Sequence, residues 1–154
     1  MKITMRRMLV SLSLLAGLAV ILSAPSSFAQ TPAQSLKQGL IGHWQLVSVS
    51  ANERAPYGAD PRGSMFLDAG GHFSIIVISD GDARSVAYFG TYMVSETDKL
   101  MTLHLEGSSG GGSPNSAGRD LKRLVALSGD ELIIQNQTAA GTAGNFKLTW
   151  KRAN

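Results

Sequence analysis

The chain has 154 residues, with 14 Lys and Arg, 11 Asp and Glu, and no cysteine. The absence of cysteine excludes a disulfide framework, a thiolate zinc site and a lipid-modified cysteine. Three of the basic residues precede residue 30, so 11 basic and 11 acidic side chains remain after it and give no charge argument for nucleic-acid binding. A chain of this length fits one domain with a single core.

A secretory signal peptide is predicted for residues 1–29. Lys2, Arg6 and Arg7 precede an uncharged stretch from Met8 to Leu22, and Ser27-Phe28-Ala29 offers small residues to signal peptidase. An uncleaved membrane anchor is the alternative, but the apolar stretch is shorter than the roughly 20 residues that span a bilayer. We therefore expect an exported protein, periplasmic or secreted, that is not stably inserted in a membrane after cleavage.

Residues 30–42 predict an N-terminal extension with one short helix. Thr31 is a favourable N-cap, and Pro32 suits the first helical position. Leu36 and Leu40 lie four residues apart, which places them on one face of this helix. No later segment is predicted to be helical.

The remaining residues, 43–154, alternate short apolar runs with clusters of Gly, Asn, Asp and Ser, a pattern typical of a β meander. The predicted strands are 43–51, 63–68, 72–79, 86–95, 100–106, 120–128, 131–138 and 145–152. Eight antiparallel strands can close into an up-and-down barrel or fold as two packed sheets. We expect the barrel, an all-β fold, whose longest and most mobile loop is the Gly- and Ser-rich segment from Gly107 to Gly118.

A two-residue turn between Glu96 and Lys99 would join these two residues as an opposite-charge pair across neighbouring strands. The register that follows aligns Val94 with Met101, Tyr92 with Leu103, and Gly90 with Leu105. This apolar face, which Tyr88 joins, is expected to point into the barrel. The opposite face is mostly polar, but it also carries Phe89 and Met93, which we expect under a loop or at an interface.

A second tight turn, at Gly129-Asp130, aligns Leu127 with Leu132, Val125 with Ile134, and Arg123 with Asn136. Arg123 therefore shares the inward face with its apolar neighbours. An inward guanidinium needs an acceptor, because burying it unpaired is costly, and it could bind a ligand carboxylate through two hydrogen bonds. The alternative is an arginine at the barrel mouth, solvated or paired with Asp or Glu, and the usual exposure of arginine favours it.

The tripeptide Gly42-His43-Trp44 resembles the Gly-x-Trp signature of the lipocalins. Further motifs extend the resemblance to the bacterial lipocalin-like domain family over residues 40–152: Tyr57-Gly58-x-x-Pro61-x-Gly63, Gly70-Gly71-His72-Phe73-Ser74, Tyr88-x-Gly90-Thr91-Tyr92, Leu103-His104-Leu105-Glu106 and Leu148-x-Trp150-Lys151-Arg152. The resemblance implies a lipocalin-type barrel of eight strands, and it implies fold more firmly than function. It also assigns Gly42, Trp44 and Arg152 to the closed base, with Arg152 or Lys151 stacked on the Trp44 ring.

Three hypotheses for function stay open. The first is a binding module without enzymatic activity that holds a small apolar or amphipathic molecule inside the barrel. Its candidate wall consists of Tyr88, Tyr92, Met101, Leu103, Val125 and Ile134, with Arg123 as a candidate anchor. The second is an isomerase- or hydrolase-type enzyme, which needs an inward acid or base that the predicted faces do not supply. The third is a filled barrel that serves as a scaffold or protein-interaction domain.

Residues that resemble other functional motifs have simpler explanations. His104 and Glu106 could hold a metal or transfer protons, but they fall on the polar outer face. The segment Gly107-Ser108-Ser109-Gly110-Gly111 matches Gly-x-Ser-x-Gly, yet a nucleophile elbow requires a helix after the turn, and none is predicted. The sequence thus predicts no catalytic residue, metal site, cofactor or nucleic-acid partner, and it leaves the ligand and the oligomeric state open.

Overall fold

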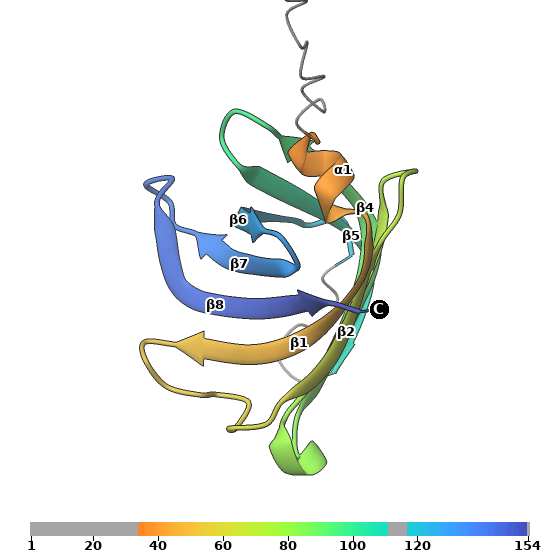
Figure 1. Cartoon of the computed structure of the whole chain (residues 1–154). Helices are drawn as coiled ribbons and strands as arrows, with labels where there is room; N and C mark the ends of the chain where they lie inside the picture. Colours follow the sequence, from red (N-terminus) through yellow and green to blue (C-terminus); the bar gives the residue numbers. More distant parts are fainter. Residues whose placement is uncertain (1–33, 111–116, 154) are drawn as a thin grey trace, which may run out of the picture. The chain divides into compact units, whose positions relative to one another are not determined.

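The computed structural model describes residues 34–110 and 117–153, which form a closed antiparallel β-barrel with one short α-helix (Figure 1). The elements are α1 (Leu36–Leu40), β1 (Gly42–Ala51), β2 (Arg62–Leu67), β3 (His72–Ile78), η1 (Asp80–Asp82), β4 (Ser85–Ser95), β5 (Leu100–Gly110), β6 (Asp120–Ser128), β7 (Glu131–Gln137) and β8 (Ala143–Arg152). Each strand pairs with the next along the chain, and β8 pairs with β1. The predicted eight-stranded up-and-down barrel is confirmed.

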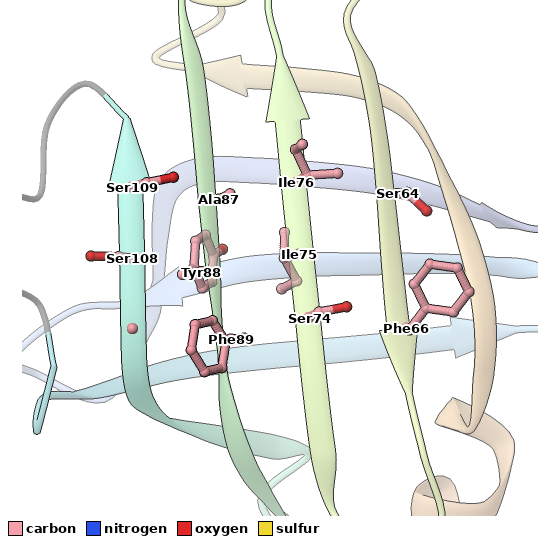
Figure 2. A pocket seen from close by; sticks show the side chains of 11 residues that line it. Ser64, Phe66, Ser74, Ile75, Ile76, Ala87, Tyr88, Phe89, Ser108 and Ser109 are labelled. Atoms are coloured by element: carbon pink, nitrogen blue, oxygen red, sulfur yellow. The ribbon is translucent and has the colours of Figure 1, made fainter.

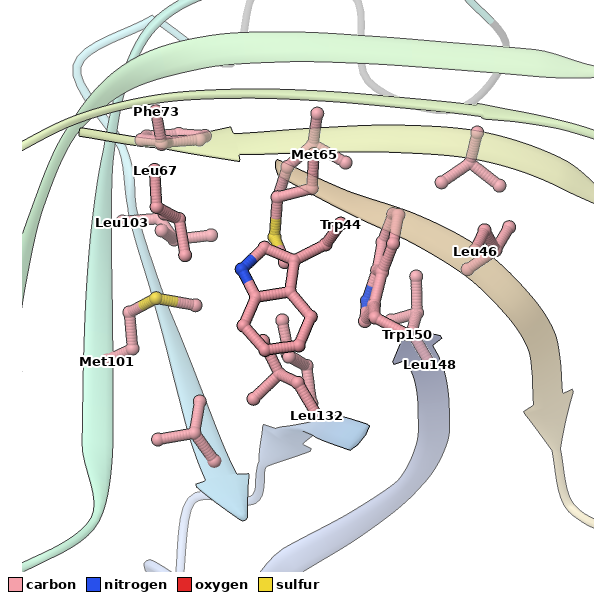
Figure 3. Close-up of a cluster of buried hydrophobic side chains, with 14 of the residues drawn as sticks. Trp44, Leu46, Met65, Leu67, Phe73, Met101, Leu103, Leu132, Leu148 and Trp150 are labelled. Carbon is pink, nitrogen blue, oxygen red and sulfur yellow. The ribbon is translucent and has the colours of Figure 1, made fainter. Parts of the chain in front are cut away.

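Strict alternation of side chains explains why these segments form strands. In β3 the side chains of Phe73, Ile75 and Val77 turn inward and are 2–4% exposed, whereas the residues between them face outward. Branched and aromatic side chains pack well on a pleated surface that is buried on one face. The inner faces of all eight strands together enclose the core, whose fully buried members include Trp44, Met65, Met101, Leu132 and Trp150 (Figure 3).

The predicted registers hold in both hairpins. The pairs Val94–Met101, Tyr92–Leu103 and Gly90–Leu105 align in β4 and β5, and Leu127–Leu132, Val125–Ile134 and Arg123–Asn136 align in β6 and β7. Tyr92, Met101 and Leu103 are buried, and His104 is exposed, so the predicted inward face is the inner face. Phe89 and Met93 face outward as predicted, but they are 52% and 71% exposed and are not covered by any described loop.

The connection between β4 and β5 differs from the prediction. It comprises the four residues 96–99 rather than two, and the register is unchanged because the connection gains one residue from each strand, Glu96 and Lys99. The carboxylate of Glu96 forms no ion pair with Lys99 in the described structure and instead accepts hydrogen bonds from the backbone N–H groups of Leu36 and Lys37, each at 2.9 Å. The predicted charge pair is therefore replaced by a cap on helix α1.

Helix α1 begins later than predicted. Ser35 is its N-cap, because its Oγ accepts a hydrogen bond from the Gln38 N–H at 3.2 Å, and Gln34 and Ser35 themselves are not helical. The predicted cap Thr31, with Pro32, lies outside the described residues, as does the predicted signal peptide. Leu36 and Leu40 share a face as expected, and Leu40 is completely buried.

Strand β5 is longer than predicted and continues to Gly110, so the first four residues of the predicted mobile loop are a strand. A register shift between Phe89 and Gly90 lets Glu106 bulge and pairs residues 107–110 with the start of β4. A side chain at position 90 would clash, because a Cβ there would lie 2.0 Å from the His104 carbonyl oxygen. The bulge therefore forms where only glycine fits the close approach of the two strands. Residues 111–116 of the predicted loop lie outside the described part of the chain.

Candidate functional site

One end of the barrel, here called the base, is the end at which β1 begins and β8 ends. Trp44 lies there with its side chain completely buried, and its Nε1 donates a hydrogen bond to the Leu40 carbonyl at 2.9 Å. The indole therefore links the first strand to the end of helix α1. A buried indole N–H that finds such a partner adds no desolvation cost to the large apolar area that it buries.

Arg152, the last residue of β8, stacks on Trp44 with its guanidinium carbon 4.2 Å from the ring centroid. It donates hydrogen bonds to the carbonyls of Ile41 at 3.0 Å and Gly39 at 2.7 Å. Gly42 leaves room for this side chain, because a Cβ at position 42 would lie 2.9 Å from Arg152 Nη1. The three residues expected at the base thus contact one another, and Arg152 rather than Lys151 covers the ring.

The opposite end, here called the mouth, is less completely filled. Several inward side chains near it are only partly buried: Val86, Tyr88, Leu121, Arg123, Asn136 and Phe146. The loop between β1 and β2 contributes Tyr57, which is 9% exposed and lies under the Arg84 guanidinium at 5.7 Å from the ring centroid. The mouth therefore combines apolar walls with aromatic hydroxyls and one inward cation.

Arg123 is the inward cation. It aligns with the completely buried Met101 on one side and with Asn136 on the other, so its side chain belongs to the inner face. Burial lowers the pKa of Arg123, and the nearby Tyr88 opposes that change. Within residues 34–110 and 117–153, its guanidinium makes one hydrogen bond, to the Lys122 carbonyl at 3.1 Å, and no ion pair.

Tyr88 lies beside this cation on β4. Its ring packs edge-on against Phe73, with the centroids 6.0 Å apart. Burial raises the pKa of the Tyr88 hydroxyl, Arg123 acts in the opposite direction, and Tyr57 raises it further. The hydroxyl therefore stays protonated at neutral pH and can donate or accept a hydrogen bond.

The predicted cavity wall divides into two groups. Tyr88 and Arg123 lie at the mouth, whereas Tyr92, Met101, Leu103, Val125 and Ile134 are no more than 4% exposed and belong to the packed core. The Tyr92 hydroxyl is already used, because it donates to the Asp68 carbonyl at 2.7 Å. The structure therefore places two of the seven predicted residues where an entering molecule would meet them.

Two histidines on the outer face form carboxylate pairs that sequence spacing did not predict. His104 Nδ1 lies 2.8 Å from Asp120 Oδ1, and His72 Nδ1 lies 3.0 Å from Asp68 Oδ2. The backbone N–H of His72, followed by its ring, lowers the pKa of Asp68. In the described part of the chain, no three such side chains gather into a group that could hold a metal ion.

A groove of about 410 Å³ crosses the outer surface of β2, β3, β4 and β5 (Figure 2). Its outward side chains are Ser64, Phe66, Ser74, Ile76, Ala87, Phe89 and Ser109, with Gly107 beneath Phe89. Phe89 was noticed in the sequence, but Phe66 and Ile76 were not. They could have been found by counting faces along β2 and β3, because both are large apolar residues at outward positions.

A scan against models of known protein families matches none of them, and a search of curated proteins finds no match. The α-helix and the 3-10 helix in the described ranges are both too short and too polar to span a membrane. The arrangement of residues at the mouth and in the outer groove therefore carries the functional argument.

Proposed function

We propose that this protein is an exported, lipocalin-like barrel whose mouth binds a small amphipathic molecule that carries an acidic group. The observation that carries the proposal is Arg123, an inward cation without an ion pair among the described residues. A partly buried guanidinium gains most from a carboxylate or similar anion, which it can hold through two parallel hydrogen bonds. The Tyr88 hydroxyl would add a third polar contact.

The apolar side chains at the mouth support an amphipathic rather than a wholly polar ligand. Val86, Leu121 and Phe146 pack against the core while leaving part of their surface exposed. An apolar chain or ring placed against them would contribute roughly 25 cal/mol for each Å² removed from water. The complete burial of the base limits the ligand to the mouth half of the barrel.

An enzymatic function is less well supported. General acid–base catalysis near neutral pH needs a group that exchanges protons there. Among the described residues at the mouth, the buried or inward ionisable groups are Arg123, Tyr88 and Tyr57, and burial raises the pKa of Tyr88 above its ordinary value of 10.0. Arg123 and Tyr88 therefore keep their protons near neutral pH and suit binding better than proton transfer.

Binding is tested by titrating the protein with dodecanoate and with dodecanol, which differ in the acidic group. We expect Arg123→Met to weaken dodecanoate binding about 10- to 100-fold, the effect of losing a charged hydrogen-bonding partner. Dodecanol binding should change little. Lys122→Met is the matched control, because Lys122 is the next residue on β6 and faces outward.

Equal weakening of dodecanoate binding by Arg123→Met and Lys122→Met would contradict the proposal, since it would show a general charge effect. Native mass spectrometry of protein purified from its own host gives an independent check. A co-purified molecule that lacks an acidic group would also argue against Arg123 as the anchor.

A further inference from the structure

The outer surface of the barrel is divided into two unlike halves. The large apolar side chains exposed by more than 40% are Val47, Phe66, Ile76, Phe89 and Met93, and in the described residues all of them lie on β1 to β4. Single exposed apolar residues are ordinary, whereas a cluster on one face marks a binding surface. Three of these residues, Phe66, Ile76 and Phe89, line the groove.

Two rows of aligned residues build the groove. In the first row, Phe66 aligns with Ser74, Ser74 with Phe89, and Phe89 with Gly107. In the second row, Ser64, Ile76, Ala87 and Ser109 align in the same way. Large rings on β2 and β4 therefore stand on either side of the small Ser74 on β3, whereas in the second row the larger Ile76 lies between small residues (Figure 2).

Both aromatic walls are held in place by the protein itself. The Phe66 ring stacks on His43 with the ring centroids 4.2 Å apart and the planes within 5°. His43 is fixed in turn by a 2.7 Å hydrogen bond between its Nε2 and the Ser64 hydroxyl. The Phe89 ring covers Gly107 so closely that a Cβ there would lie 2.5 Å from it. Because the walls are ordered beforehand, binding between them costs little conformational entropy.

The spacing and charge of the groove define what fits. The backbones of strands two apart in a sheet are separated by about 10 Å, which leaves room for one flat ring above Ser74 between Phe66 and Phe89. None of the residues that line the groove carries a charge, and Ser64, Ser74 and Ser109 offer hydroxyls at its floor and rim. The volume of about 410 Å³ lies within the range of roughly 300–1,000 Å³ of small-molecule sites.

We infer that this outer groove is a second binding site, for a flat, uncharged aromatic molecule held between Phe66 and Phe89. The groove lies on the outer surface of the barrel, whereas Arg123 faces inward at the mouth. The ligand expected in the groove carries no acidic group. The site is therefore independent of the proposed function at Arg123.

Nile red, a flat, neutral fluorescent dye, is the probe for this site. We expect one dye per chain at the groove, with a dissociation constant that rises at least about tenfold in Phe89→Ser, because the ring contact is lost. Ser74→Phe should weaken binding as strongly, since the new ring fills the floor between the two walls. Both positions face outward on strands, so the substitutions leave the core intact.

Ser74→Phe distinguishes binding in a groove of defined shape from binding to a generally apolar surface, because it adds apolar area but fills the space between the two rings. Met93→Ser is the matched control, since Met93 is the more exposed residue on the same strand and lies outside the groove. Binding that rises in Ser74→Phe, or that falls equally in Met93→Ser, would overturn the inference. Sensitivity to Arg123→Met instead would place the dye at the mouth.

A second copy of the chain could also cover an apolar face, and sedimentation of the protein without dye tests this alternative. We expect a single species that does not change with concentration. A dimer that dissociates in Phe89→Ser would overturn the inference and assign the groove to a second copy of the chain.

Discussion

The barrel holds two inward arginines, one at each end, and they are bonded very differently. At the base, Arg152 stacks on Trp44, donates to two backbone carbonyls and has a carboxylate oxygen of Asp130 at 3.4 Å. At the mouth, Arg123 donates to one carbonyl, that of its own neighbour, at 3.1 Å. The guanidinium at the base is bonded within the protein and stabilises the fold, whereas the Arg123 nitrogens that make no bond within the described residues are left to water or a ligand. The same residue type therefore closes one end and leaves the other ready to bind.

The largest effect is expected at the base. Trp44→Ala should destabilise the domain by about 3–5 kcal/mol, because it removes a completely buried indole and leaves a cavity under Arg152. The measurement is the free energy of unfolding from urea denaturation. A midpoint close to that of the wild type would show that the base is not the stable end.

The two arginines can be compared directly by the same substitution. Arg152→Met should cost about 2–3 kcal/mol, since it removes charged hydrogen bonds and the stacking on Trp44. Arg123→Met should change the free energy of unfolding by less than about 0.5 kcal/mol or increase it, because an unpaired, partly buried charge is removed. Equal losses at both positions would remove the distinction between the ends.

Gly42 offers a smaller and more local test. Its φ of 137° lies in the region that favours glycine, and a side chain there would meet the Arg152 guanidinium. Gly42→Ala should therefore cost about 1–3 kcal/mol. Arg152→Met should cost less in the Gly42→Ala background than in the wild type, because the clash with the new side chain is relieved, and simple additivity of the two changes would show that the residues do not interact.

The smallest effect concerns the pH dependence of helix α1. The backbone N–H of Lys37, followed by that of Leu36, lowers the pKa of Glu96 below its ordinary value of 4.5. A depressed pKa means that the stabilisation is complete above 4.5 and is lost as the pH falls through the folded-state value. Glu96→Gln should therefore reduce the loss of stability below pH 4.5, measured by thermal melting across pH in parallel with the wild type.

The fold was predictable because the signals were local. Apolar runs between clusters of turn residues marked every strand, and the turn at Gly129-Asp130 gave the correct register. The path of Glu96 was not predictable, since its partners lie 60 and 59 residues away on a helix whose beginning the sequence placed too early. The sequence also did not predict the bulge opposite Phe89 and Gly90. Because of this bulge, the small residues 107–110 belong to β5 rather than to the predicted loop.

The candidate sites were only partly predictable for the same reason. Arg123 was found because alternation alone shows which face a strand residue occupies. Which inward residues lie in the filled base and which lie at the mouth depends on their position along the barrel axis, and Tyr92 and Tyr88 cannot be distinguished by alternation. The outer groove needs four strands in register at once, so single hairpins showed Phe89 but not its counterpart Phe66.

The seam between β1 and β8 also sets the order in which the chain can fold. The bonds from Arg152 to Gly39 and Ile41 join residues 113 and 111 positions apart, so the first and last strands meet only when almost the whole chain is present. Pairings between such distant segments form slowly. Until the last strand arrives, β1 presents an unpaired edge that other chains can join. A nascent or truncated chain that lacks β8 is therefore the form of this protein most prone to aggregate.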